Sequence, residues 1–176
     1  VVWKIVSTFA SSNDKINVSN ATTIMEINDL TYGGILRKYG ISYLGSAAKS
    51  AKLIHSLEHG TLTYAIYLAP SDMSGYNVCP KSAHCREHCL NQSGHNKADI
   101  IAHGFAESKV NKARIKRSKL FYTDREAFMF LLIHEIKRYE LMAKREGLAF
   151  SVRLNGTSDL SPLAFKYHGK CILDIF

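Results

Sequence analysis

Residues 61–89 read TLTYAIYLAPSDMSGYNVCPKSAHCREHC, and this stretch determines how the rest of the chain is interpreted. Its first nine residues, Thr61 to Ala69, are β-branched, aromatic and aliphatic, and they lie between Gly60 and Pro70. This composition between two turn residues predicts a strand that is covered on both faces. A turn-rich loop follows the strand and leads directly into three cysteines.

The segments after the cysteines predict alternating helices and strands. Residues 97–119 carry apolar side chains at helical spacing, and a second helix begins at the Thr123-Asp124-Arg125-Glu126 capping box and ends before Gly147. Strands are expected at Leu148 to Leu154 and at Cys171 to Phe176, with a short helix at Leu160 to Tyr167.

The N-terminal part is less regular. We expect a strand at 1–9, a polar loop at 10–22, and over 23–38 either one helix broken at Gly33-Gly34 or two short helices. Residues 47–54 fit a helix or a strand equally well.

Together the elements predict an α/β fold of one domain. We expect a partial or incomplete β/α (TIM-like) barrel with parallel strands and an N-terminal, mostly helical extension. The extension would cover residues 1–45, and the β/α core would cover 46–176 with a cysteine loop at 71–95. Because the chain lacks an initiator methionine and ends in an apolar strand, we expect it to be truncated at both ends.

Composition narrows the class of protein. The 176 residues are 46% apolar and 22% charged, as in a soluble domain with a buried core. Apolar runs stay below the roughly 18 residues that cross a membrane, and no signal peptide is visible at the start. We expect a cytoplasmic protein without a membrane partner. The net charge of +8 favours an anionic substrate or a nucleic acid as partner.

Three of the four cysteines, Cys79, Cys85 and Cys89, lie within eleven residues. A polar segment has no packing reason to gather thiols, and thiolates bind zinc and iron–sulfur clusters. Three cysteines in one loop suit a [4Fe-4S] cluster with one iron left open for a ligand. Free thiols or a disulfide without metal are a further alternative. Zinc is also an alternative, with a fourth ligand from His84, His88, His95 or Cys171.

The turn after the second predicted strand is the other half of the predicted site. In β/α folds, ligands bind beyond the carboxyl ends of the strands, and residues 155–159 (NGTSD) lie at such an end. The same residue types also form ordinary turns. Arg153 is a charge in an apolar strand, and its alternative role is an ion pair with Asp174. The candidate cofactor contacts are Arg153, Asn155, Gly156, Thr157 and Asp159.

A basic stripe lies on the first of the two long helices. Six of the eleven residues in 109–119 are Lys or Arg, and four lysines share one helical face. Such a stripe fits the phosphates of a nucleic acid, and a solvated helix face is the alternative. The four lysines are Lys109, Lys112, Lys116 and Lys119.

A cysteine loop directly after the first barrel strand resembles the radical S-adenosylmethionine superfamily. That resemblance implies a [4Fe-4S] cluster whose open iron binds S-adenosylmethionine, and an enzyme that starts radical chemistry by cleaving it. The C-x5-C-x3-C spacing here differs from the usual C-x3-C-x2-C. The NGTSD turn also lacks the Gly-rich motif that contacts the cofactor in that superfamily.

The chain resembles the gene product 88 family more closely, over roughly residues 41–176. That resemblance implies a phage-encoded protein in the host cell cytoplasm, with a chain that continues past the third strand, and it implies no established activity. The matching runs are 67–70 (YLAP), 74–80 (SGYNVCP) with Cys85, Cys89 and Leu90, 119–121 (KLF) before 124–126 (DRE), and 153–159 (RLNGTSD).

We therefore expect an iron–sulfur protein, and a possible radical enzyme, that uses the three cysteines as ligands. The alternative is a zinc-stabilised nucleic-acid-binding module without catalytic activity, in which the lysine stripe contacts phosphates.

Overall fold

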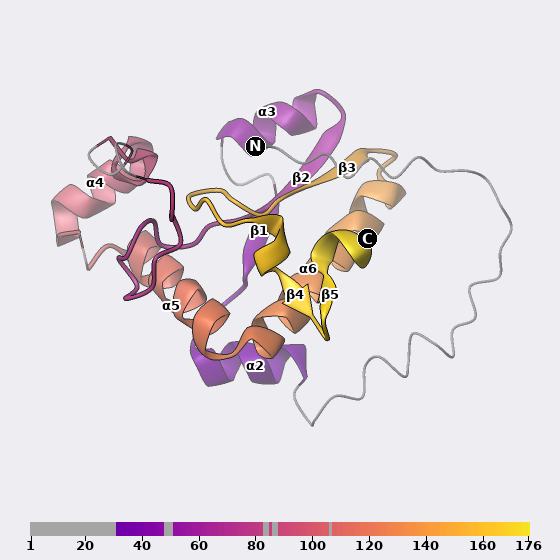
Figure 1. The fold of residues 1–176 in the computed structure, drawn as a ribbon. Coiled ribbons are helices and arrows are strands. Elements are labelled where there is room, and N and C mark those ends of the chain that lie inside the picture. Colours follow the sequence, from indigo (N-terminus) through magenta and orange to yellow (C-terminus); the bar gives the residue numbers. More distant parts are fainter. Residues whose placement is uncertain (1–30, 48–50, 83–84, 86–87, 106) are drawn as a thin grey trace, which may run out of the picture.

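The framework of the molecule is a small mixed sheet with the strand order β1–β2–β3 (Figure 1). The computed structural model describes residues 31–47, 51–82, 85, 88–105 and 107–176. β2 pairs in parallel with β3 and antiparallel with β1. The strands are β1 (Gly45–Ala47), β2 (Thr61–Ile66) and β3 (Ala149–Arg153).

Helices supply most of the remaining regular structure in the described part of the chain. No helix there is long and apolar enough to cross a membrane. The α-helices are α2 (Tyr32–Tyr39), α3 (Ala51–Glu58), α4 (Gly94–His103), α5 (Lys109–Thr123) and α6 (Arg125–Arg145). The short elements are η1 (Leu90–Gln92), η2 (Pro162–Ala164), β4 (Lys166–Tyr167), β5 (Lys170–Cys171) and η3 (Ile172–Asp174).

The helix α6 is the centre of the core. It packs against all three strands of the sheet, against α2 and against β4. Figure 1 shows α5 and α6 diverging from their junction at Asp124, with α2 lying across that junction. Phe121 from α5, Phe128 from α6 and Phe165 pack ring against ring, with centroids about 5–6 Å apart and all three side chains buried. Burial of these rings fixes the angle at which the two long helices meet.

The parallel pairing of β2 and β3 positions the candidate site. The register runs from Thr61 opposite Ala149 to Ala65 opposite Arg153. Because parallel strands end at the same edge of a sheet, the cysteine loop after β2 and the NGTSD turn after β3 leave the sheet side by side. The two halves of the predicted site therefore meet, although about 75 residues separate them in sequence.

The structure confirms four of the predictions: the mixed α/β class, the strand at 61–66, the strand at 149–153 and the helix that ends before Gly147. The prediction of parallel strands holds for β2 and β3 only, because β1 is antiparallel. Three strands are too few to close a sheet on itself, and no barrel closure is present among the described residues. The predictions for residues 1–30 lie outside the described residues.

The prediction of a single helix over 97–119 is wrong. The chain forms α4 and α5 instead, because Gly104 at φ +86° ends α4 and the hydroxyl of Ser108 caps α5 by accepting from the backbone N–H of Asn111. The capping box at Thr123 is also wrong. Thr123 is the last residue of α5, and Asp124 caps α6 by accepting from the N–H of Ala127 at 3.1 Å.

Two further local predictions are corrected. Gly33-Gly34 does not interrupt the helix, because the side chain of Thr31 caps α2 by accepting from the N–H of Gly34. The C-terminal strand is limited to Lys170–Cys171, after which Asp174 accepts from the N–H of Cys171 and turns the chain into η3. The helix expected at 160–167 is only the single turn η2, followed by β4.

Candidate ligand cavity beside the cysteine loop

A cavity of about 570 Å³ lies between the cysteine loop and the segment after β3. Its volume is in the range of small-molecule sites, about 300–1,000 Å³. All eight residues predicted as metal ligands or cofactor contacts line this cavity. Its walls are formed by Cys79, Pro80, Lys81, Ser82, Cys85, Cys89 and Asn91 on one side and by Arg153 and residues 155–162 on the other.

The N-terminal end of the cysteine loop is anchored to the rest of the fold, and this anchoring positions Cys79. Val78 is fully buried, and its carbonyl oxygen accepts from the N–H of Asp159 at 2.9 Å. The ring of Tyr76 stacks on that of Tyr122 with centroids 4.6 Å apart, and the Tyr122 hydroxyl donates to the carbonyl of Asn77. Since Cys79 directly follows these contacts, its position relative to the NGTSD turn is set by the fold.

The Cys79 thiol is half-buried and surrounded by backbone. The N–H of Ser71 donates to its sulfur at 3.2 Å, and its sulfur lies 3.8 Å from the carbonyl oxygen of Thr157. Burial raises the pKa of this thiol above its ordinary value, whereas hydrogen bonds from the backbone of Ser71 and Asp159 act in the opposite direction. N–H donors directed at sulfur are the usual outer contacts of a thiolate ligand.

The other end of the loop is held by a buried amide cluster, which fixes Cys89. Asn91 and Asn111 are almost fully buried, and the side-chain N–H of Asn91 donates to the side-chain oxygen of Asn111 at 3.1 Å. Asn96 joins them from α4. Because buried amides must find partners, this cluster locks η1, α4 and α5 together directly behind Cys89.

Arg114 brings a positive charge to the same place. It donates to the side-chain oxygen of Asn91, and its guanidinium lies 5.5 Å from the centre of the Tyr67 ring. Burial lowers the pKa of Arg114, while the nearby Tyr67 and Cys89 act in the opposite direction. Arg114 therefore places a positive charge at this anchored end of the cysteine loop, next to Asn91.

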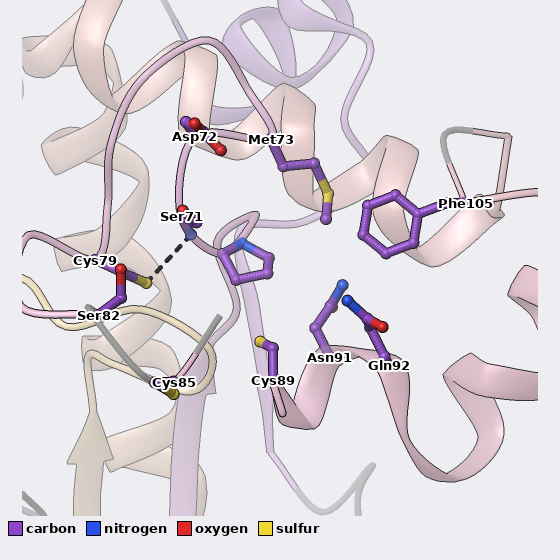
Figure 2. A pocket seen from close by; sticks show the side chains of 11 residues that line it. Ser71, Asp72, Met73, Cys79, Ser82, Cys85, Cys89, Asn91, Gln92 and Phe105 are labelled. Carbon is purple, nitrogen blue, oxygen red and sulfur yellow. Dashed lines mark hydrogen bonds between the residues drawn. The ribbon is translucent and has the colours of Figure 1, made fainter. Parts of the chain in front are cut away.

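Cys85 lies between these two anchored ends and is exposed. The loop reaches it through two turns, in which Ser82 N–H donates to the Cys79 carbonyl and Cys85 N–H donates to the Ser82 carbonyl. All three thiols are free, and Figure 2 shows Cys79 and Cys89 approaching from opposite ends of the loop with Cys85 beside them. In the described part of the chain, no three His, Cys, Asp or Glu side chains are already arranged around one metal position. The donor set still fits a soft metal cofactor, because three free thiols line one wall.

The NGTSD turn is mostly used for structure. The carboxamide of Asn155 accepts from Ser158 and from the N–H of Leu160, and it donates to the Leu160 carbonyl at 2.7 Å. Thr157 donates its hydroxyl proton to the carbonyl of Leu68 at 2.6 Å, and the N–H of Gly156 donates to the carbonyl of Ile66. Asn155, Gly156 and Thr157 therefore join the turn to the end of β2 and to the chain that follows it.

Arg153 and Asp159 keep their charged ends available to the cavity. Arg153 uses only its Nε, which donates to the carbonyl of Asn155 at 3.2 Å. Its alternative partner Asp174 instead accepts from the N–H of Cys171, and no ion pair joins the two among the described residues. Asp159 donates its backbone N–H to Val78, and its side chain is exposed.

Two of the four candidates for a fourth zinc ligand, His88 and Cys171, do not line the cavity. Cys171 is buried and its thiol donates to the carbonyl of Pro162 at 3.5 Å. His88 is exposed and does not line the cavity. His84 and the side chain of His95 lie outside the described part of the structure.

The predicted lysine stripe is a separate surface on α5. All four lysines are exposed, but Lys112 pairs with Glu107, and Lys116 donates to the carbonyl of Gly40 at 2.9 Å. Lys109 and Lys119 have no such contacts among the described residues. The stripe does not line the cavity and is not part of the thiol site.

Asn91, Asn111 and Arg114 were missed by sequence reasoning. Their side chains meet only after α4 and α5 fold back on the cysteine loop, and a lone Asn in a polar segment normally predicts a turn. One sequence signal could have identified them: polar residues in α5 occupy positions where the helical period places core residues, which indicates buried polar contacts.

One family model, described as gene product 88, matches residues 36–170 of the chain. No curated protein matches the chain, and no solved structure matches it. The comparisons give no match to the radical S-adenosylmethionine superfamily.

Proposed function

The chain belongs to the gene product 88 family, and we propose that it is an iron–sulfur protein whose cluster is bound by Cys79, Cys85 and Cys89. The observation that carries the proposal is the shared cavity of about 570 Å³, which all three free thiols line together with the segment after β3. A [4Fe-4S] cluster with three thiolate ligands leaves one iron open to a further ligand.

The three-thiol donor set supports a cluster with three protein ligands. A structural zinc ion takes four protein ligands, and Cys171, one candidate for the fourth, is buried with its thiol directed at the carbonyl of Pro162. The backbone N–H of Ser71 donates to the Cys79 sulfur at 3.2 Å, and the guanidinium of Arg114 donates to Asn91, two residues after Cys89. The N–H of Ser71 stabilises negative charge on the Cys79 sulfur, as a thiolate ligand requires, whereas burial of this thiol acts in the opposite direction.

The rest of the cavity would hold the ligand of the open iron. Lys81 and Arg153 place two positive charges on its walls and Asp159 places one negative charge there. This combination suits a small zwitterionic or anionic molecule with a carboxylate. S-adenosylmethionine has such groups and stays the prediction to test first, with enzymatic radical chemistry as the activity that it would imply.

The proposal is tested by anaerobic cluster reconstitution followed by elemental analysis. We expect iron and sulfide in equal amounts and a broad visible absorbance. Replacement of Cys79, Cys85 or Cys89 by Ser should lower the iron content strongly, because each removes one thiolate ligand. Cys171→Ser is the matched control and should retain the iron. Reconstituted wild-type protein without iron would overturn the proposal.

A zinc-stabilised nucleic-acid-binding module is the second candidate. It is favoured by the exposure of Lys109, Lys112, Lys116 and Lys119 on α5, and by the link from Lys116 to the end of α2, which carries Arg37 and Lys38. For this function the same elemental analysis should give zinc without sulfide.

A further inference from the structure

A second cavity of about 360 Å³ adjoins the first at the cysteine loop. It shares Cys79, Cys85, Cys89, Ser82 and Asn91 with the first cavity, so the three thiols line both. Its remaining lining comes from Pro70, Ser71, Asp72, Met73, Gln92 and Phe105, most of which are shown in Figure 2.

Part of the wall of this second cavity is apolar. It is formed by Pro70, Met73 and Phe105, and Figure 2 shows the side chains of Met73 and Phe105 next to each other. An unbranched thioether and an aromatic ring adapt readily to a flat apolar group. The polar part of the wall consists of the three thiols, the Asp72 carboxylate, the hydroxyls of Ser71 and Ser82, and the side-chain amides of Asn91 and Gln92, which lie beside Phe105 in Figure 2.

Phe105 is held in this position by its backbone rather than by packing of its ring. Its carbonyl accepts from the buried side-chain N–H of Asn111 at 2.8 Å, yet the residue remains 41% exposed. Gly104 ends α4 directly before it, so the short link between α4 and α5 presents the ring to the cavity. Aromatic side chains in the wall of a cavity are typical of small-molecule binding sites.

We propose that the second cavity binds the apolar or aromatic part of a small organic molecule and directs its reactive end toward the thiols. The volume lies in the range of small-molecule sites, about 300–1,000 Å³. The assignment of this molecule as the substrate rests on the proposed function, whereas the apolar binding site itself needs no metal.

The test uses the metal-free protein and two thiol reagents. Monobromobimane is flat and apolar, and iodoacetamide is small and polar. In both reactions the thiolate forms a carbon–sulfur bond and a halide ion leaves. Mass spectrometry of Cys85 and Cys89 gives both rates. We expect the bimane rate to saturate with reagent concentration, since binding precedes reaction, and the iodoacetamide rate to rise linearly.

Substitutions separate the apolar site from simple thiol accessibility. Phe105→Ala and Met73→Ala should each lower the bimane rate by roughly tenfold and leave the iodoacetamide rate unchanged. Phe105→Leu should restore part of the loss. Ile101→Ala is the matched control, because Ile101 is an exposed apolar residue on α4 that does not line the cavity.

The proposal would be overturned if Phe105→Ala and Met73→Ala slowed the reactions of both reagents equally. It would also be overturned if the bimane rate in wild-type protein rose linearly with reagent concentration. Circular dichroism of each variant distinguishes loss of the site from loss of folding. This outcome is independent of iron uptake. If the substitutions slow only the bimane reaction and the protein takes up no iron, the apolar site stands and the proposed iron–sulfur function is removed. If the protein takes up iron and the substitutions do not distinguish the two reagents, the iron–sulfur function stands and the apolar site is removed.

Discussion

At Gly156 the fold leaves no room for a side chain. A Cβ built there would lie 2.5 Å from Cδ1 of Tyr67 and 2.7 Å from the carbonyl oxygen of Ile66. The backbone of the NGTSD turn therefore lies directly on the end of β2, where its N–H also donates to Ile66. The absence of a side chain is required by this packing, before any contact with a ligand is considered.

Gly156→Ala should consequently destabilise the protein, by about 1–3 kcal/mol for an overpacked site. Because the turn would move away from β2, we also expect lower iron uptake on reconstitution. Chemical denaturation followed by circular dichroism measures the free energy of unfolding. A variant as stable as wild type would show that the turn does not need this close contact.

Gly33→Ala is the matched control. The added Cβ would meet only the flexible end of Arg37 at 3.5 Å, in the first turn of α2. Alanine is favoured over glycine by about 0.5–1 kcal/mol in a helix interior and by less in the first turn, so this variant should be as stable as wild type or slightly more stable.

At the scale of the elements, the buried carboxylate of Glu135 joins four of them. One oxygen accepts from the Tyr32 hydroxyl of α2 and the N–H of Leu44, and the other from the N–H of Gly45 and the Tyr64 hydroxyl, all at 2.7–2.8 Å. Glu135 is 0% exposed. Burial raises the pKa of the Tyr64 hydroxyl well above its ordinary value, so tyrosine stays protonated and donates. Helix α6 thereby holds α2, β1 and β2 by one side chain.

Glu135→Gln should destabilise the protein by about 3 kcal/mol, because the new amide group would face two donors and lose two charge-assisted hydrogen bonds. Denaturant titration of variant and wild type gives the difference. Glu140→Gln on the same helix is the control, since that side chain is only partly buried, and it should change stability by less than about 0.5 kcal/mol. Equal stability of the two variants would contradict a structural role for this network.

At the scale of the whole molecule, the net charge of +8 bears on the second candidate function, a nucleic-acid-binding module. Binding of nucleic acid should weaken with salt, because each lysine that contacts a phosphate releases about one counterion. Lys109→Gln or Lys119→Gln should each reduce the slope of log K against log salt by about 0.9. Lys112→Gln should have a smaller effect, because Lys112 is paired with Glu107.

Fluorescence anisotropy of a labelled oligonucleotide at several salt concentrations measures these slopes. Lys170→Gln, at an exposed lysine on β5, is the control for a general loss of positive charge. Absent binding, or binding that salt leaves unchanged, would remove the nucleic-acid function and leave the thiol cavity as the candidate site.

Local sequence signals were sufficient for β2, β3, α6 and the three-cysteine loop. Each depends on residues within a few positions of one another: β-branched runs between turn residues, apolar residues at helical spacing, and thiols gathered in a polar segment. The parallel pairing of β2 and β3 also followed from the order of the elements. It correctly brought the cysteines and residues 153–159 to one cavity.

The tertiary structure alone decided what the polar residues do. The hydroxyl of Thr157 bonds to Leu68, 89 residues away, and the carboxylate of Glu135 bonds to residues 71–103 positions away. Asn111 reaches both Asn91 and the carbonyl of Phe105. A buried polar group must take whichever partner the packed chain brings to it, and no local pattern identifies that partner. The sequence by itself therefore determined that the three cysteines and residues 153–159 reach the site, whereas packing added Asn91 to it and decided which polar groups remain free to bind a ligand.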